Sequence, residues 1–231
     1  GVTIASFVNM PGSMITRMSD YKFMAEAGPE ICVMSTKTFF SQIAFGYMLA
    51  KAIVGQLSDA KKNLQQVAHA LYAYLQQDHN EIKQLAKKLS RKEHIFLLGK
   101  NQNFHIIREG MVKIMEGAYL HGHALPAGDL KHYVITLMEK GVPVIVIVSN
   151  DPFKADMLNA VHQVRTRGAE VTAIAPANDP SYDTYIAVPD TGETSSIMNL
   201  LPLHLLSYYM AIELGNNVDK PRNIAKSVKV K

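Results

Sequence analysis

The spacing of hydrophobic residues changes along the chain and separates two regions. Before about residue 92, most apolar positions recur at helical spacing. After it, short apolar runs alternate with longer stretches that are apolar on one side and polar on the other. Short apolar strands alternating with helices are typical of a parallel sheet covered on both faces. We therefore predict an α/β fold with a doubly wound parallel sheet from about residue 90 to 215.

The first region predicts one strand followed by three helices. Ser35 or Thr36 is a plausible N-cap for the first helix, and Gly55 is a plausible stop. We expect residues 56–92 to form a helical connector. The predicted elements are a strand at 2–8 and helices at 35–55, 58–77 and 80–89.

The second region alternates strand and helix throughout. Ligands of doubly wound sheets bind at the carboxyl ends of the strands, so the loops that follow the strands are candidate sites. The predicted strands are 94–99, 142–149, 170–176 and 184–189, and the predicted helices are 103–118, 153–167 and 195–215.

Composition and charge exclude several classes of protein. A hydrophobic content of 48% with 19% charged residues indicates a globular chain with a sizeable core. The net charge is +4, but no basic run is interleaved with aromatic residues, so we predict no nucleic-acid partner. A small anionic substrate fits this charge equally well. The longest apolar run, residues 142–149, is too short to cross a bilayer, so we predict no membrane association.

The chain has one cysteine and no spacing typical of a metal site. Cys32 cannot form an internal disulfide, which favours a reducing compartment, and we expect a cytoplasmic protein. Cys32 lies in an apolar stretch and is expected to be a buried small hydrophobe. His121, His123 and His132 have no carboxylate or thiol at ligand spacing, so we predict neither a metal nor another cofactor.

The predicted helix 103–118 carries three charged residues on one face. Glu109, Lys113 and Glu116 stand at i, i+4 and i+7. One interpretation is a solvated stripe with an ordinary surface ion pair. The other is a carboxylate beside a lysine, which is an arrangement that tunes a general base. Similarly, His132 is either a structural histidine or an acid–base residue on a loop.

Two hydroxyl-rich turns precede helices. Residues 191–196, "TGETSS", resemble a phosphate-binding turn but also an ordinary helix start, and we favour the helix cap. Residues 34–39 present the same two alternatives. The C-terminal tail, residues 216–231, is basic and interrupted by a proline. It is either a frayed terminus or a segment that folds back and delivers the amine of Lys226 to a pocket.

Three motifs resemble, in chain order, the isomerase half of the glutamine–fructose-6-phosphate aminotransferases, which is built from two sugar-isomerase (SIS) domains. They are "MPGSMITRMSDYKFMAEAGPEICVMSTKTF" at 10–39, "REGMVKIMEGAYLHGHALPAGDLKHY" at 108–133 and "DKPRNIAKSVKVK" at 219–231. The resemblance implies conversion of fructose 6-phosphate and glutamine-derived ammonia to glucosamine 6-phosphate. It also implies a glutaminase domain in the parent chain and a homodimer. Under this resemblance, we expect the end of a first SIS domain at 1–55 and a second SIS domain at 93–215.

The resemblance assigns three catalytic roles. Lys226 corresponds to the lysine that opens the sugar and forms a Schiff base with its carbonyl. Glu116 corresponds to the base that moves a proton between two sugar carbons. His132 corresponds to a histidine that assists ring opening and reaches the site from a neighbouring subunit. The tail is then expected to cover the pocket.

The resemblance also assigns substrate-binding residues. Ser35 and the backbone of Val33 and Ala225 correspond to sugar contacts, while Lys113 and Glu109 line the site. The sequence departs from the family pattern because a "SQSGET"-type phosphate cradle and the glutaminase domain are absent, so we expect a piece of a longer chain. Further departures are "GKNQ" at 99–102, Tyr133 and Lys231. A non-catalytic SIS module that binds or senses a sugar phosphate is the alternative.

Overall fold

The structure is a computed structural model that describes residues 1–225 of the chain. Its main sheet has five strands in the order β4-β3-β5-β6-β7, and every neighbouring pair is parallel. The chain leaves β3 for β4 on one side and then crosses back to β5 on the other. The predicted α/β class with a parallel sheet is confirmed. The strands are β3 (His94–Gly99), β4 (His121–Pro126), β5 (Pro143–Ile147), β6 (Glu170–Ala175) and β7 (Thr184–Ala187).

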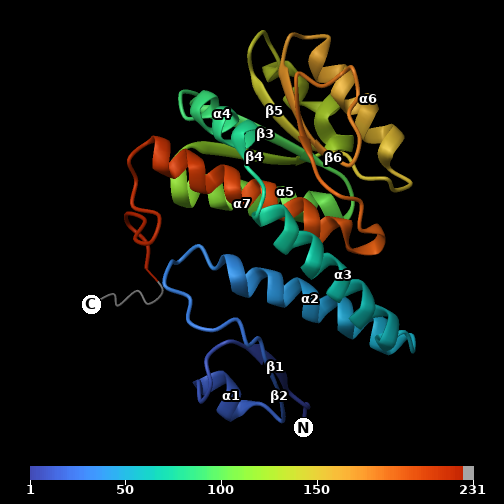
Figure 1. Cartoon of the computed structure of the whole chain (residues 1–231), viewed down its shortest axis with the longest axis vertical. Helices are drawn as coiled ribbons and strands as arrows, with labels where there is room; N and C mark the ends of the chain where they lie inside the picture. Colours follow the sequence, from blue (N-terminus) through green and yellow to red (C-terminus); the bar gives the residue numbers. More distant parts are fainter. Residues whose placement is uncertain (226–231) are drawn as a thin grey trace.

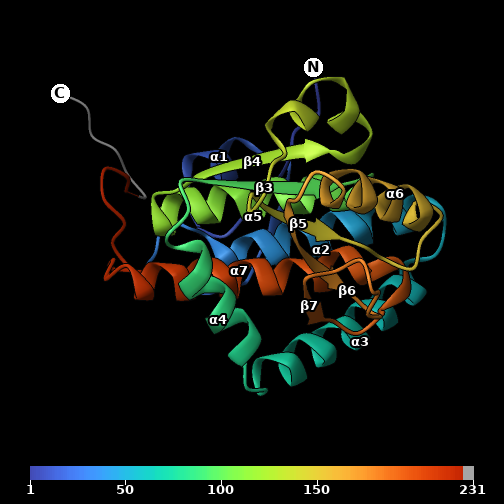
Figure 2. The ribbon, with the colours of Figure 1, turned by 90° about the horizontal axis from the view of Figure 1, so that it is seen from above.

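Helices cover both faces of this sheet because successive strand residues point to opposite sides. In β3, Ile95 and Leu97 join a core with α4, α5 and α7, whereas Phe96 and Leu98 join a second core with α6. Figures 1 and 2 show α6 and α7 on opposite sides of the strands. The helices are α4 (Asn80–Leu89), α5 (Gln102–Ala118), α6 (Lys154–Arg165) and α7 (Ser195–Glu213), with short 3-10 turns at Ala127–His132, Val134–Leu137 and Gly192–Thr194.

Strand β4 was not predicted from the hydrophobic pattern. Its sequence, "HGHALP", begins with two histidines and a glycine and has no apolar run of the kind seen in β5. It lies at the edge of the sheet, pairs only with β3 and is only partly buried. An edge strand does not need to be apolar on both faces, so its sequence signal is weak.

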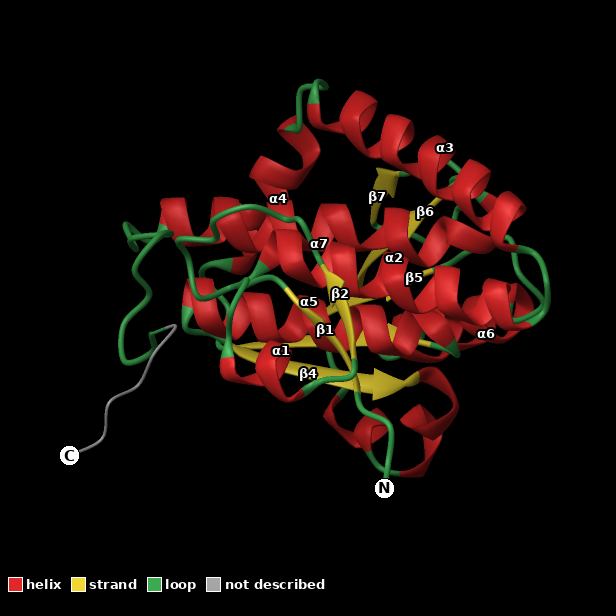
Figure 3. Ribbon diagram, turned by 90° about the horizontal axis from the view of Figure 1, so that it is seen from below, coloured by secondary structure: helices red, strands yellow, loops and turns green. Residues whose placement is uncertain are grey.

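The N-terminal part forms a second, smaller unit beside helix α2. Strands β1 (Ala5–Val8) and β2 (Tyr21–Met24) form a separate parallel pair joined through α1 (Met14–Met18). The pair packs on α2 (Thr36–Ile53), where Phe7 stacks on Phe45 with ring centroids 4.3 Å apart. Figure 1 shows β1 and β2 next to α2 and apart from the main sheet, and Figure 3 shows the two strands from below, beside α2.

The predicted connector contributes to the core. Helix α3 (Leu57–Leu75) follows α2, and α4 then packs against α7. Ile82, Leu85 and Leu89 of α4 are almost completely buried. The domain boundaries at residues 55 and 92 remain a prediction. Within residues 1–225, no helix combines the length and hydrophobicity that a membrane crossing needs.

Helices α5 and α7 approach each other closely through glycines. A Cβ atom added at Gly110 would lie 2.6 Å from Leu203 Cδ1, and one added at Gly117 would lie 2.8 Å from Ser207 Oγ. The two glycines are seven residues apart on one face of α5, and their contacts are one turn apart on α7. This contact fixes the spacing between the two helices that carry the candidate site.

We expect Gly110→Ala to lower the free energy of unfolding by about 1–3 kcal/mol, because Leu203 is completely buried and the methyl group would overpack the contact. Urea denaturation measures the change. The matched control is Gly46→Ala in α2, where an added Cβ meets nothing within 4 Å. The control should raise stability by up to about 1 kcal/mol through helix propensity. Equal gains in both variants would contradict the close contact.

Candidate active site

The three charged residues predicted on one face of α5 form a largely buried cluster. Lys113 Nζ lies 2.7 Å from Glu116 Oε2 and 3.2 Å from Glu109 Oε1. The exposed fraction of the side chain is 5% for Lys113, 10% for Glu109 and 24% for Glu116. The solvated-stripe interpretation is therefore wrong. A buried ammonium needs counter-charges, and the two carboxylates supply them.

A histidine from α7 extends this cluster. His204 Nε2 lies 3.8 Å from Glu109 Oε1, and both atoms are buried without a hydrogen-bond partner among the described residues. The ring of Phe40 in α2 packs edge to face against His204, with centroids 5.4 Å apart. Sequence reasoning did not single out His204. The available signal was a histidine flanked by leucines, "LPLHLL", within the long apolar run that forms α7.

The loop before α2 reaches the same region. Ser35 stands at the predicted N-cap of α2, but its φ of 55° is left-handed and its hydroxyl donates to the Val33 carbonyl at 3.0 Å. The helix amide of Lys37 instead donates to the Glu30 carboxylate at 2.8 Å. The cap position is thus confirmed, although a different side chain caps the helix. Met34, between Val33 and Ser35, is buried near Gly117 of α5.

The described part of the tail packs against this loop and the end of α5. The Cys32 thiol donates to the Val218 carbonyl at 2.9 Å, and the Asn216 amide donates to the Gly117 carbonyl at 2.9 Å. The Arg222 amide donates to the Tyr119 hydroxyl at 2.9 Å, and its guanidinium lies over the ring at 4.2 Å. These contacts tie residues 216–222 to the body of the protein.

Cys32 was expected to be buried, but it is only partly buried, because it lies at the surface where the tail crosses the loop. Ala225 is exposed and is the last described residue. Lys226 lies outside the described residues.

His132 is separated from the cluster within one chain. It is exposed in the 3-10 turn that follows the carboxyl end of β4. Glu116 lies near the end of α5, just before β4 begins. The six residues of β4 separate the two positions, a length of roughly 20 Å. The structure therefore brings Glu109, Lys113 and Glu116 together, and it places Met34, between Val33 and Ser35, beside Gly117 at the end of the same helix. His132 is not part of this group.

The turn at residues 191–196 is a helix start, as favoured from the sequence. The Ser195 hydroxyl donates to Asp190 Oδ1 at 2.9 Å, and the Thr194 hydroxyl donates to the Thr191 carbonyl at 2.9 Å. Asp190 also accepts the Gly192 amide. Hydrogen bonds from Asn150, Gly192 and Ser195 lower the pKa of Asp190. A carboxylate already occupies the turn that a phosphate would need.

The histidines of β3 and β4 form a separate surface group. His94 Nδ1 lies 3.0 Å from His123 Nε2, and the His121 ring is adjacent to that of His94. Burial, followed by the nearby His94 and His121, lowers the pKa of His123. Across residues 1–225, no group of three or more histidine, cysteine or acidic side chains is arranged to hold a metal ion.

Comparison with known proteins agrees with this arrangement of sheet and helices. Residues 88–214, more than half of the chain, match the sequence model of the SIS domain. The chain belongs to the SIS domain family. The matched part includes the whole main sheet together with α5, α6 and α7. Both helices that carry the charged cluster therefore lie in the SIS domain.

Relatives share the flanking segments as well. The chain is 35% identical over 238 residues to a glutamine–fructose-6-phosphate aminotransferase (isomerizing) of Pyrobaculum aerophilum, covering 100% of this chain and 40% of the relative. The corresponding protein of Thermococcus kodakarensis is 34% identical with the same coverage. This SIS protein thus spans about 40% of the length of these curated relatives.

A solved structure shows the same arrangement. The C-terminal domain of glucosamine-fructose-6-phosphate aminotransferase from Francisella tularensis superposes with a TM-score of 0.83 at 30% identity. The match covers 92% of this chain and 63% of that chain. Tagatose-6-phosphate ketose/aldose isomerase from Escherichia coli has a TM-score of 0.74 at 18% identity, which shows a shared fold alone.

Proposed function

We propose that this SIS protein is the sugar-isomerising part of an enzyme that makes glucosamine 6-phosphate from fructose 6-phosphate and ammonia. The observation that carries the proposal is the meeting of three segments between the middle and the C-terminal end of α5. They are the cluster of Glu109, Lys113 and Glu116, the loop at residues 33–35, where Met34 lies beside Gly117, and the tail anchored at residues 216–222. The names of the similar aminotransferases support the choice of substrate.

The proposed reaction begins with the amine of Lys226. It adds to the C2 carbonyl of open-chain fructose 6-phosphate and forms an imine with loss of water. Ammonia then replaces the lysine amine at C2. Glu116 removes a proton from C1 and returns it to C2, while the C1 hydroxyl proton passes to the nitrogen on C2, so that C1 becomes the aldehyde and C2 carries the amine. The product is a 2-amino aldose phosphate, and Lys226 is regenerated.

The other residues have positioning roles in this proposal. Lys113 holds the Glu116 carboxylate in one orientation through the contact at 2.7 Å. Ser35 and the backbone of Val33 and Ala225 contact the sugar, and Glu109 supports Lys113 from the other side. His132 assists ring opening from the second subunit of a homodimer. That assignment is consistent with its separation from Glu116 within one chain. A glutaminase domain of the parent protein supplies ammonia.

The tail supports the choice of an enzyme over a module that only binds a sugar phosphate. Three hydrogen bonds hold residues 216–222 against Cys32, Gly117 and Tyr119, and Ala225 follows three residues later. Residues 216–222 are anchored beside Gly117, which follows Glu116, and Lys226 comes next after Ala225 in the sequence. This order suits an imine between the lysine amine and a sugar carbonyl. A sensor has no need of that amine.

Borohydride trapping tests the imine directly. We expect sodium borohydride, added to the full chain with fructose 6-phosphate, to leave a reduced sugar adduct on Lys226 that peptide mass spectrometry locates. Lys226→Arg should abolish the adduct, and the matched control Lys220→Arg, in the same tail, should retain it. Sugar-phosphate binding without any adduct on Lys226 would favour the non-catalytic module.

A further inference from the structure

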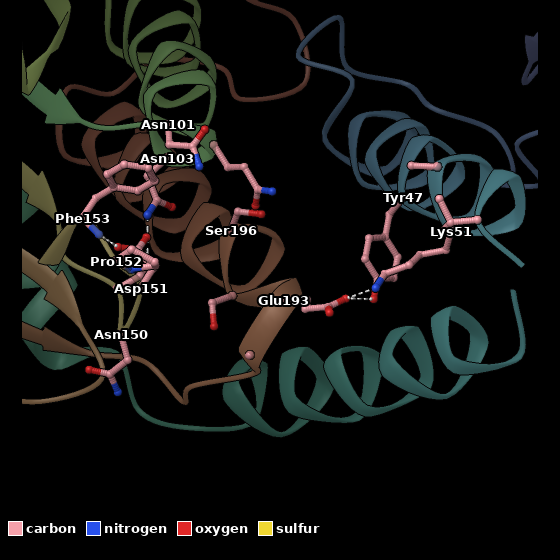
Figure 4. Close-up of a pocket in the computed structure, with 16 residues that line it drawn as sticks. Tyr47, Lys51, Asn101, Asn103, Asn150, Asp151, Pro152, Phe153, Glu193 and Ser196 are labelled. Carbon is pink, nitrogen blue, oxygen red and sulfur yellow. Dashed lines mark hydrogen bonds and ion pairs between the residues drawn. The ribbon is translucent and has the colours of Figure 1, made fainter. Parts of the chain in front are cut away.

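A cavity that none of the three charged cluster residues lines lies at the start of α5. Its volume is about 510 Å³, within the range of small-molecule sites. The loops after β3 and β5 form one side of it, and α2 and the start of α7 form the other. Figure 4 shows Asn103 and Phe153 facing Tyr47 and Glu193 across it. Since the chain leaves β3 and β5 in opposite directions, this is the switch point where doubly wound sheets bind ligands.

Three buried polar side chains lie beneath this cavity, and two of them, Asn103 and Ser149, line it. Asn103, Ser149 and Asn199 are at most 7% exposed. The amides of Asn103 and Asn199 donate to Ser149 Oγ at 2.9 and 3.0 Å, and Asn199 also donates to Asn103 Oδ1 at 3.1 Å. Ser149 Oγ therefore accepts two hydrogen bonds, which fill its lone pairs. Its own proton has no acceptor among the described residues, and Ser149 lines the cavity.

The charges around the cavity disfavour an anion. The Asp151 carboxylate accepts the Phe153 amide at the start of α6, and Asp190 accepts the Gly192 amide just before α7. Two helix starts that would suit a phosphate thus already hold a carboxylate. The Lys51 ammonium lies 2.6 Å from Glu193, so the lysine at the rim is already paired. The contact with Lys51 also lowers the pKa of Glu193.

The remaining lining suits a ligand rich in hydroxyl groups. Amide and hydroxyl side chains supply both donors and acceptors, and two aromatic rings supply apolar surface. One of these rings, Phe153, has the Lys100 ammonium 5.3 Å from its centroid. Asn101 has φ 53° and ψ −127°, a backbone conformation that glycine usually adopts. The polar and aromatic lining residues are Asn101, Gln102, Asn103, Ser149, Asn150, Ser195, Ser196, Tyr47 and Phe153.

We propose that this cavity binds an uncharged polyhydroxylated molecule, such as an unphosphorylated sugar or polyol. The proposal rests on the buried Asn103–Ser149–Asn199 network beneath the cavity. It also rests on Asp151 and Asp190, whose carboxylates already bind the amides at the two helix starts that would suit an anion. The site is separate from the charged cluster, because none of Glu109, Lys113 and Glu116 lines the cavity. The proposed base, Glu116, lies thirteen residues along α5 from Asn103, which corresponds to roughly 20 Å. It therefore does not depend on the proposed isomerase chemistry.

Binding by the full chain is the test. We expect saturation-transfer NMR to detect glucose, N-acetylglucosamine and sorbitol, and we expect inorganic phosphate not to compete with them. Ala50 of α2 lines the cavity and is exposed, so Ala50→Trp should fill the space without disturbing the core. It should weaken binding at least tenfold. Ala52→Trp, at an exposed position on the same helix that does not line the cavity, is the matched control and should bind like the parent.

The outcomes separate this site from the catalytic proposal. Equal binding by the two tryptophan variants, or no binding of any neutral probe, would overturn the site. Displacement of the probes by inorganic phosphate would show that the cavity takes anions, which also contradicts the proposal. Borohydride trapping on Lys226 should proceed in Ala50→Trp, so failure of one proposal leaves the other measurable. Circular dichroism of both variants checks that the fold is retained.

Discussion

Glu116→Gln is expected to reduce kcat for isomerisation by about 10²- to 10⁴-fold while leaving KM for fructose 6-phosphate nearly unchanged. Glutamine has the size of glutamate but cannot take a proton from C1 of the sugar. Glu116 is 24% exposed, so the amide does not have to be buried deeply. Its oxygen can still accept from Lys113. Steady-state kinetics on the full chain, with ammonia as the nitrogen donor, separates the two constants.

The matched control for this variant is Glu213→Gln, an exposed glutamate at the end of α7. The control removes one exposed carboxylate that is not part of the cluster, and turnover should not change. Unchanged turnover in Glu116→Gln would remove Glu116 from the mechanism. A large rise in KM at constant kcat would assign it to substrate binding instead.

Much of the fold could be predicted from hydrophobic spacing. The buried strands β3, β5 and β6 are short apolar runs, and the helices between them are amphipathic, so each element has a strong local signal. Strand β4 was missed because an edge strand with two histidines and a glycine has no such signal. The start of β1 was misplaced by three residues, since Val2 and Ile4 are apolar but exposed.

The candidate site was predictable only in part, because its residues come from segments far apart in sequence. Helical spacing placed Glu109, Lys113 and Glu116 on one face, but only the packing of α7 shows that this face is buried. His204 was missed because its partner, Glu109, is on another helix. The Asn103–Ser149–Asn199 network joins the first turn of α5, the loop after β5 and α7, and no sequence pattern connects its members.

Among the substitutions described, replacement of Lys113, the buried ammonium of the cluster, should have the largest effect on stability. Lys113→Met is expected to lower the free energy of unfolding by about 3–5 kcal/mol, because it leaves the Glu109 carboxylate buried without a counter-charge. Glu109 is 10% exposed, and its Oε1 already lacks a hydrogen bond among the described residues. Urea denaturation at neutral pH measures the loss.

The double variant Lys113→Met/Glu109→Gln separates charge from packing. If Lys113→Met is unstable because the Glu109 carboxylate is unpaired, Glu109→Gln removes that charge. The double variant should then recover more than half of the stability lost in Lys113→Met, even though it carries one more substitution. Glu116 needs no such repair, since its greater exposure lets water solvate it when the ammonium is gone. If the double variant is as unstable as Lys113→Met, the lysine stem stabilises by packing, and the ion pairs do not hold the site together.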